Sequence, residues 1–330
     1  MKSSLPTKKN LDLPATCAAD LAPYRPLSEV IRATEKLTAD AAGLVHVIGH
    51  SVEGRPIQAI ELKASTDHRP SVLVCANIHG IEYIAVEVAL GFLAQAGHSD
   101  SLVTQLRQRT NIWIIPTLNP DAYERTWVQG GRGVLSELRT NANGVDLNRN
   151  FPKPSKNRPT WINFGGWRLG SPDPENAFYR GKVSLSEPES RALAHLHDRV
   201  SFHASANLHS TMGTVIPPCV NTAAEYDQYG ALVRAFRDGQ SKWGYRRMAN
   251  RWFDRFTGEQ EDFQHHQHDA WALCIEHYPL WFQPWRFRPG NSLFWRFNPT
   301  SPSSWVANDI PGIVGFFSAA LEMPPPSQLN

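Results

Sequence analysis

A buried strand joined to a helix by a short polar segment constrains the fold of this chain most. It lies in the stretch Ser71–Leu93, SVLVCANIHGIEYIAVEVALGFL. The apolar, β-branched residues 72–74 predict a strand, whereas the longer apolar run 86–93 predicts a helix. His79 and Glu82 lie between the two, at the carboxyl end of the strand, where open α/β sheets place their sites. Imidazole and carboxylate both bind zinc, but an H-x-x-E pair alone is more often incidental, and a catalytic zinc needs a third protein ligand.

Strands and helices alternate along the rest of the chain, which favours an α/β fold. The strand regions are a hairpin over His46–Leu62 that turns at Glu53–Pro56, and the runs Ile112–Thr117, Phe202–Leu208 and Ala270–Ile275. The helical regions are Leu27–Leu37, Leu102–Arg107, a segment ending at Val200, Tyr226–Trp243 and Ser304–Leu321, the last broken by Pro311. For the segment ending at Val200 we expect Ser186 as N-cap and Glu189 as its partner in a capping box.

The organisation expected is a single domain with an arm and a tail. Residues 1–45 form an N-terminal arm and helix that pack on the body, 46–323 the catalytic domain, and 324–330 a solvent-exposed tail. The Gly-, Pro- and Asn-rich region 125–182 has little periodicity, and a structureless loop of that size is usually functional.

Composition and cysteine spacing indicate the cellular compartment but say little about binding partners. The 330 residues are 41% hydrophobic, which suits a soluble globular protein of enzyme size, and the net charge of +2 argues neither for nor against a strongly charged partner. Four cysteines are scattered without a C-x-x-C pair, and we see neither a signal peptide nor an 18-residue apolar span. We therefore expect a reduced, cytoplasmic protein that binds neither membrane nor nucleic acid.

Two further strands end in residues that suit the same chemistry. The Phe202 strand closes on His209 and the Ala270 strand on Glu276, while the box GVDLNRNF spans residues 144–151. Each feature alone has an ordinary explanation: a histidine at the edge of the core, a glutamate paired with an arginine, and polar loop residues. All of them occurring together by chance is improbable.

The order of these pieces resembles the zinc carboxypeptidases, the M14 metallopeptidase family. The matching segments are SVEGRPI at 51–57, H-G-x-E at 79–82, Asn-Pro-Asp at 119–121, an Arg before GVDLNRNF, S-E-P-E at 186–189, His209-Ser210, and the strand that ends in Glu276. They cover about residues 46–280. The resemblance implies a mixed, mostly parallel β-sheet flanked by helices.

The resemblance also implies a role for each site residue. His79, Glu82 and His209 would hold one Zn²⁺ per chain with a water in the fourth position. Glu276 would act as general base and Arg139 would stabilise the oxyanion. Asn148 and Arg149 would bind the terminal carboxylate of the substrate, with Arg149 as a bidentate fork.

Two departures from the family and one position that agrees with it concern the substrate pocket. The lid tyrosine expected 22 residues before the general base is Asp254 here, so it is absent or displaced to Tyr245. Thr211 replaces a tyrosine often found two residues after the third zinc ligand. Fifteen residues before Glu276 the family places the floor of its specificity pocket, which is Glu261 here. An acid there would select basic terminal residues, unless Glu261 faces solvent in a charged turn.

The function expected is a zinc metallocarboxypeptidase acting on an amide next to a free carboxylate. Two alternatives stay open: an M14-like amidase or deacylase acting on cell-wall muropeptides or N-acyl amino acids, and a catalytically silent zinc fold used for binding. The cluster His265, His266 and His268 suggests a second metal, but adjacent histidines do not share one helix face. The basic and aromatic residues of the segment Trp281–Phe297 could stack on nucleic acid, but the sequence favours a loop packed against the body.

Overall fold

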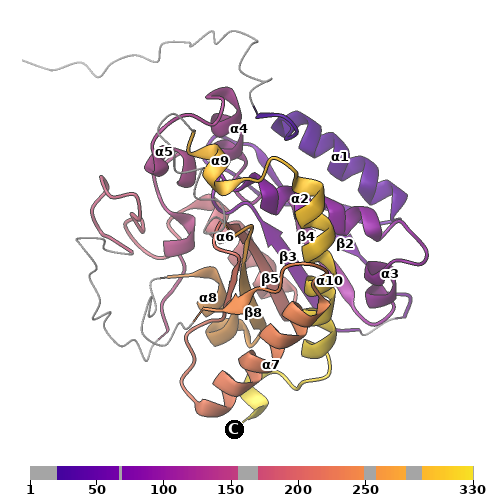
Figure 1. Ribbon diagram of the computed structural model, residues 1–330. Helices are drawn as coiled ribbons and strands as arrows, with labels where there is room; N and C mark the ends of the chain where they lie inside the picture. Colours follow the sequence, from indigo (N-terminus) through magenta and orange to yellow (C-terminus); the bar gives the residue numbers. More distant parts are fainter. Residues whose placement is uncertain (1–20, 67–68, 155–169, 249–257, 280–291, 330) are drawn as a thin grey trace, which may run out of the picture.

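A mixed eight-stranded sheet forms the centre of the protein in its computed structural model, which describes residues 21–66, 69–154, 170–248, 258–279 and 292–329 (Figure 1). The strand order within these residues is β1-β2-β4-β3-β5-β8-β6-β7. The strands are β1 Leu44–His50, β2 Pro56–Leu62, β3 Ser71–Ala76, β4 Asn111–Ile115, β5 Phe202–Ser210, β6 Thr214–Ile216, β7 Arg246–Arg247 and β8 Trp271–His277. The pairings β3–β4, β3–β5, β5–β8 and β6–β7 are parallel, and the other three are antiparallel. The expected mixed, mostly parallel sheet is confirmed.

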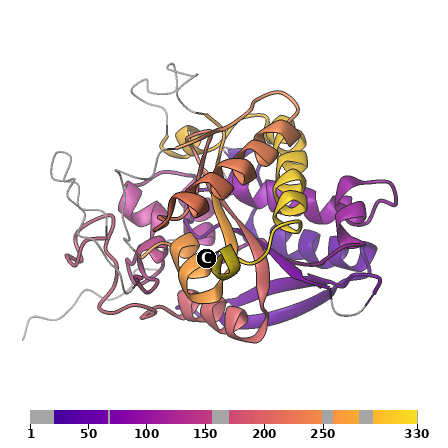
Figure 2. The same ribbon diagram turned by 90° about the horizontal axis from the view of Figure 1, so that it is seen from below.

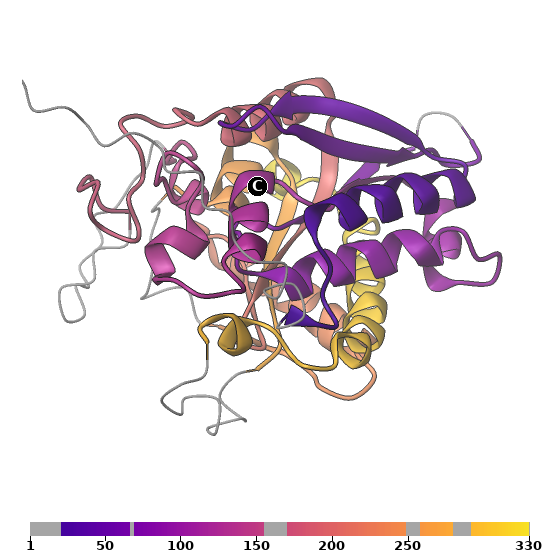
Figure 3. The ribbon, with the colours of Figure 1, turned by 90° about the horizontal axis from the view of Figure 1, so that it is seen from above.

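Helices cover both faces of this sheet. They are α1 Leu27–Asp40, α2 Tyr83–Gln95, α3 Leu102–Arg107, α4 Pro120–Val128, α5 Leu135–Arg139, α6 Pro188–Arg199, α7 Ala223–Gly239, α8 Gln260–His268, α9 Phe294–Phe297 and α10 Pro302–Ala320, with 3₁₀ turns at Leu147–Arg149 and Pro326–Leu329. The apolar faces of α2, α3, α7 and α10 pack on one side of the sheet, where α7 and α10 lie side by side (Figure 2). Residues of α6 and α8 pack on the other side. Helix α1 lies against α2 and the β1–β2 hairpin (Figure 3).

Strand β3 lies inside the sheet and is buried along its whole length. It pairs in parallel with β4 on one side and β5 on the other, so both edges of its backbone are hydrogen-bonded. A strand covered on both faces has no solvent side, which explains why its sequence is apolar without alternation. The carboxyl ends of β3, β5 and β8 therefore meet at one edge of the sheet, which is the edge that carries the candidate site.

Several local predictions were wrong. The N-cap of α6 is Glu187, and no side chain caps this helix, because the carboxylate of Glu189 accepts hydrogen bonds from Val52 N and Asn141 Nδ2 instead. Helix α10 runs through Pro311 without a break. Region 125–182 is not structureless, since it holds the end of α4, then α5 and a 3₁₀ turn.

The C-terminal segment is tied to the body by hydrogen bonds, while Pro324, Ser327 and Gln328 stay exposed as expected for the tail. Ser327 N donates to Asp269 Oδ1 at 2.6 Å, and Trp271 Nε1 donates to Pro324 O at 3.0 Å. At the other end, Leu21 and Tyr24 are buried, and Tyr24 donates to Pro299 O. Within the described residues, no helix is both long and apolar enough to span a bilayer.

Candidate metal centre and its surroundings

Three buried donor groups converge on one point. His79 follows β3, Glu82 is the N-cap residue of α2, and His209 lies near the end of β5. The two Nδ1 atoms are 3.2 Å apart, and the Glu82 carboxylate lies 2.9 Å from Nδ1 of His79 and 3.1 Å from Nδ1 of His209. Donors around a tetrahedral zinc with bonds of about 2.05 Å are separated by about 3.3 Å, so the three groups fit a zinc ion.

The loop that carries His79 is held by glycine and asparagine. A Cβ on Gly80 would lie 2.3 Å from Ala122 Cβ and 2.6 Å from its carbonyl carbon, so no residue larger than glycine fits at position 80. Asn77 Nδ2 donates to His79 O at 3.0 Å, and Asn119 Nδ2 donates to Ile78 O at 3.1 Å. The loop is therefore fixed against the start of α4 before any ligand binds.

Asp146 supports the first histidine from behind. Its Oδ1 lies 3.2 Å from Nε2 of His79, and its Oδ2 accepts from Arg139 Nε at 2.9 Å. The Arg139 guanidinium and the hydrogen bond from His79 keep the pKa of Asp146 far below its usual range, although burial alone would raise it. An ionised Asp146 makes Nε2 of His79 the donor and leaves the Nδ1 lone pair for a metal.

The charges of the cluster also suit a cation. Burial opposes ionisation of Glu82, but His79 and His209 lower its pKa to about 2. Burial lowers the pKa of His209, which keeps this imidazole neutral and able to act as a ligand. The carboxylate is thus ionised and buried, and its Oε2 faces Nδ1 of His209 at 3.1 Å without meeting the geometry of a hydrogen bond. A cation between the three groups would satisfy that oxygen.

Glu276 lies beside this cluster, as expected. The β5–β8 register pairs it with His209, and donor atoms of Glu276, Cys274 and His209 all lie within 4.8 Å of one another. Burial and the nearby Glu82 carboxylate raise the pKa of Glu276 to about 8. A cation bound to Glu82 would offset that repulsion and lower the pKa of Glu276 again.

The two residues of the predicted carboxylate clamp are buried beside the first turn of α8. Asn148 Oδ1 accepts from Gln260 N at 2.8 Å, and Arg149 Nη1 donates to Asn148 O at 2.6 Å. Arg149 Nη1 also lies 3.2 Å from Glu259 Oε1. Glu261 is in the same turn and only 1% exposed, so the alternative that it faces solvent was wrong.

Hydrogen bonds show the roles of Tyr245 and Thr211, the two described residues that concern the missing family tyrosines. Tyr245 is 2% exposed and donates to Asp309 Oδ2 at 2.9 Å, so it is not a displaced lid tyrosine. Asp254 lies outside the described residues. Thr211 Oγ1 donates to Arg296 O at 2.7 Å, so it ties the end of β5 to α9.

The histidine cluster on α8 does not converge. His265 lies 3.0 Å from Tyr229 OH, and Nε2 of His266 lies 2.7 Å from Cys219 O. The ring of His268 packs against those of His197 and Phe263. Among the residues that the structure describes, no metal-ligand group includes these histidines. Of the segment Trp281–Phe297, residues 281–291 lie outside the described part of the chain. Phe294 is buried against the body as expected, although it lies in the short helix α9 and not in a loop.

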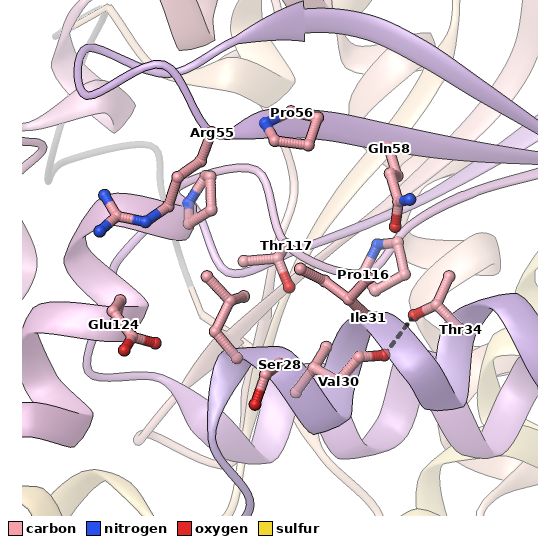
Figure 4. A pocket seen from close by; sticks show the side chains of 12 residues that line it. Ser28, Val30, Ile31, Thr34, Arg55, Pro56, Gln58, Pro116, Thr117 and Glu124 are labelled. Carbon is pink, nitrogen blue, oxygen red and sulfur yellow. Dashed lines mark hydrogen bonds between the residues drawn. The ribbon is translucent and has the colours of Figure 1, made fainter.

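A separate pocket of about 310 Å³ lies beside α1, away from these residues (Figure 4). Its wall combines apolar side chains of α1 with residues around β2 and the turn between β4 and α4. The lining residues are Leu27, Ser28, Val30, Ile31, Thr34, Arg55, Pro56, Gln58, Pro116, Thr117, Pro120 and Glu124. Because it contains none of the predicted site residues, it is not the candidate active site.

Comparison with known proteins decides the family. The family model described as "Zinc carboxypeptidase" matches residues 30–279, and these residues include the whole cluster. The chain belongs to the zinc carboxypeptidase family. It is 36% identical over 198 residues to the carboxypeptidase N catalytic chain of Homo sapiens, an alignment that covers 55% of this chain and 41% of that relative. The chain therefore spans less than half the length of this curated relative.

Solved structures show the same fold. Thrombin activatable fibrinolysis inhibitor superposes with a TM-score of 0.73 at 18% identity, over 91% of this chain and 75% of the other. A metallo-carboxypeptidase from Pseudomonas aeruginosa, solved in complex with (2-guanidinoethylmercapto)succinic acid, gives 0.59 at 20% identity, over 89% and 69% of the two chains. These likenesses confirm the predicted zinc carboxypeptidase fold.

Other sequence motifs of the zinc carboxypeptidase family serve as supports. Asp121 of the Asn-Pro-Asp motif accepts from Ser51 Oγ at 2.6 Å and from Arg55 Nη1 at 2.7 Å, so it joins α4 to the β1–β2 turn. Asn141 Nδ2 donates to both glutamates of S-E-P-E, Glu187 and Glu189. Sequence reasoning assigned no role to Asp146, although it lies inside the GVDLNRNF box between Arg139 and the clamp residues.

Proposed function

We propose that this chain is a zinc-dependent metallocarboxypeptidase that hydrolyses the amide bond next to a free C-terminal carboxylate. The observation that carries the proposal is the convergence of Nδ1 of His79, Nδ1 of His209 and the Glu82 carboxylate, with Glu276 beside them. Three protein ligands leave one coordination position open, as in catalytic zinc sites. One zinc ion per chain is expected at this cluster, where it would acidify a water molecule and polarise the scissile carbonyl.

The residues around the cluster suit the remaining steps. Glu276 would take the proton of the attacking water and pass it to the leaving amine. Arg139, oriented through Nε by Asp146, would present its other N–H groups to the developing oxyanion. Asn148 and Arg149 would bind the terminal carboxylate, which places the scissile bond toward the zinc ligands.

We further propose a preference for basic terminal residues. Glu261 is buried in the first turn of α8, the turn in which Gln260 contacts Asn148 and Glu259 contacts Arg149. A buried carboxylate attracts the ammonium of lysine or the fork of arginine. The Pseudomonas aeruginosa relative was solved with a ligand that carries a guanidino group and a succinic acid, the same pair of charges.

The substrate would be a peptide, with no role for nucleic acid or membrane. For the compartment, we keep the cytoplasm as a proposal from the sequence, supported by the scattered cysteines. Of these, Cys75, Cys219 and Cys274 are buried, and none of the three forms a disulfide within the described residues.

Zinc content and hydrolysis test the proposed function together. The purified chain should hold about one zinc and release the last residue of N-blocked dipeptides with a free acid, faster for lysine than for leucine. His79→Ala, Glu82→Ala and His209→Ala should each lose zinc and activity, because two protein ligands do not hold the ion. Stoichiometric zinc in all three variants, or equal hydrolysis of free-acid and amidated substrates, would contradict the proposal. A parallel screen of muropeptides and N-acyl amino acids shows whether either is the better substrate.

A further inference from the structure

Glu259 and Gln260 at the start of α8 hold both residues of the predicted carboxylate clamp. Glu259 is the N-cap residue of α8, yet its side chain makes no capping hydrogen bond to the helix. Its carboxylate instead lies 3.2 Å from Nη1 of Arg149, and each side chain is 6% exposed. The amide N–H of Gln260 is accepted by Asn148 Oδ1 at 2.8 Å. Asn148 therefore caps the helix while Glu259 pairs with Arg149.

The arrangement is unusual for an N-cap glutamate. A carboxylate at a helix N-terminus is ordinarily stabilised by the free N–H groups of the first turn. Here the Gln260 N–H donates to Asn148 Oδ1, and the buried carboxylate of Glu259 has the Arg149 guanidinium beside it as a compensating charge. A buried carboxylate without such a partner would be costly, which fixes the pair in place.

The pair changes the charge that an incoming substrate meets. Arg149 is the cation that the proposed function assigns to the terminal carboxylate, but one carboxylate of the protein already lies against its Nη1. A substrate carboxylate would be the second anion at the same guanidinium and would be repelled by Glu259. Glu261 and Asp262 follow in the same turn and are also buried, so three buried acidic residues lie in this turn beside Arg149.

We propose that Glu259 is a specificity-determining residue whose carboxylate competes with the substrate's terminal carboxylate for Arg149. This inference rests on the proposed function and refines it. Carboxylate-terminated substrates bind more weakly than Arg149 alone would allow. Substrates that also carry a cationic terminal side chain are favoured, because their positive charge offsets the surrounding acids. Glu259 acts on substrate binding and takes no part in proton transfer.

Two neutral replacements test the competition. Glu259→Gln removes the charge at nearly constant size, and Glu259→Ser removes it while restoring a good N-cap residue, so at least one of them should fold. For N-blocked dipeptides that end in free lysine, both should lower KM about 10-fold, which corresponds to about 1.4 kcal/mol, with kcat nearly unchanged. KM for the matching amides should not change. Glu259→Asp keeps the negative charge and should therefore not lower KM for the free-acid peptides as the neutral variants do.

A binding measurement gives a readout that does not depend on turnover. In a Glu276→Gln background, calorimetry with (2-guanidinoethylmercapto)succinic acid should show about 10-fold tighter binding after Glu259→Gln. Glu261→Gln is the matched control: it removes a buried acid from the same turn and should weaken the guanidino ligand instead. Zinc content and thermal unfolding of each variant show that fold and metal are retained.

The outcomes separate this inference from the proposed function. A parent protein that neither hydrolyses free-acid peptides nor binds the guanidino ligand would remove the proposed function, and the inference with it. An active parent whose KM is unchanged or raised by both neutral replacements would remove the inference alone. An equal change for free acids and amides would also overturn it, since competition for Arg149 requires the terminal carboxylate.

Discussion

Asp146 lies between His79 and Arg139 and bonds to both, accepting from His79 Nε2 at 3.2 Å and from Arg139 Nε at 2.9 Å. One carboxylate thus fixes the tautomer of a predicted zinc ligand and the orientation of a predicted oxyanion stabiliser. The roles of two residues that are 60 positions apart in the sequence therefore depend on a third residue that touches neither the metal nor the substrate.

Asp146→Asn should weaken zinc binding by about 10- to 100-fold, the usual cost of losing the carboxylate behind a ligating histidine. The amide loses the charge that keeps the Nε2 proton of His79 in place. Competition with a chelator at fixed free zinc measures the affinity. Asp198→Asn, at an exposed aspartate, is the matched control and should bind zinc like the parent. Equal affinity in the two variants would show that Asp146 does not support the metal.

Glu276→Gln should separate metal binding from catalysis. The substitution keeps the shape of the side chain but removes the group that accepts a proton. We expect kcat to fall about 10²- to 10⁴-fold, the usual contribution of a positioned general base, while zinc remains at its parent level. Single-turnover kinetics together with metal analysis checks both numbers. Activity within a few fold of the parent would move the general base to another residue.

Gly80→Ala should distort the metal loop. The added Cβ would lie 2.3 Å from Ala122 Cβ and 2.6 Å from its carbonyl carbon, and backbone atoms cannot move aside as a side chain end can. Overpacking of this kind costs about 1–3 kcal/mol of unfolding free energy, and displacement of His79 should also lower zinc affinity.

Denaturant unfolding of Gly80→Ala, with and without zinc, measures both effects. Gly97→Ala is the control, because its Cβ would meet nothing closer than 3.5 Å. If Gly80→Ala were as stable as Gly97→Ala, the close approach of this loop to α4 would be wrong.

His197 should make stability fall in acid. Burial lowers the pKa of His197 to about 3 from 6.5, so the folded protein binds its proton less readily than the unfolded chain does. The contribution of neutral His197 to the free energy of unfolding is therefore complete above pH 6.5. It is lost as pH falls toward 3, with a slope of up to about 1.4 kcal/mol per pH unit.

His197→Gln removes this titration, while its amide can still accept from Gln264, whose Nε2 lies 3.2 Å from Nε2 of His197. Urea unfolding of the zinc-free parent and variant between pH 7 and pH 4 should give a shallower loss for the variant. Parallel stability curves would mean that His197 is protonated in the folded protein.

The sequence determined the elements that depend on local pattern. The apolar run of β3 and the longer apolar run after it were enough to predict a strand and a helix, whereas His79 and Glu82 became predicted zinc ligands only through the resemblance to zinc carboxypeptidases. The alternation of strands and helices then placed His209 and Glu276 at the same edge of the sheet. These inferences succeed because strand periodicity and parallel pairing are nearly independent of the remaining side chains.

Errors arose where a polar side chain had several partners available. Ser186 and Glu189 have the spacing of a capping box, but Asn141 and the turn at Val52 bind Glu189 instead. For Glu261 the sequence left two environments open, a pocket and a solvent-exposed charged turn, and the packing of α8 excludes the second. Competing hydrogen-bond partners come from distant segments, which a local pattern does not contain.

Tertiary structure alone decided how the site is supported and charged. The bonds of Asp146 to His79 and Arg139, and the pair of Glu259 with Arg149, join residues 7 to 110 positions apart. The sequence indicates the type of chemistry because only a few kinds of side chain bind zinc or act as acids and bases. Which charge faces which depends on distances of about 3 Å across the fold, since Coulomb and hydrogen-bond energies fall steeply beyond contact.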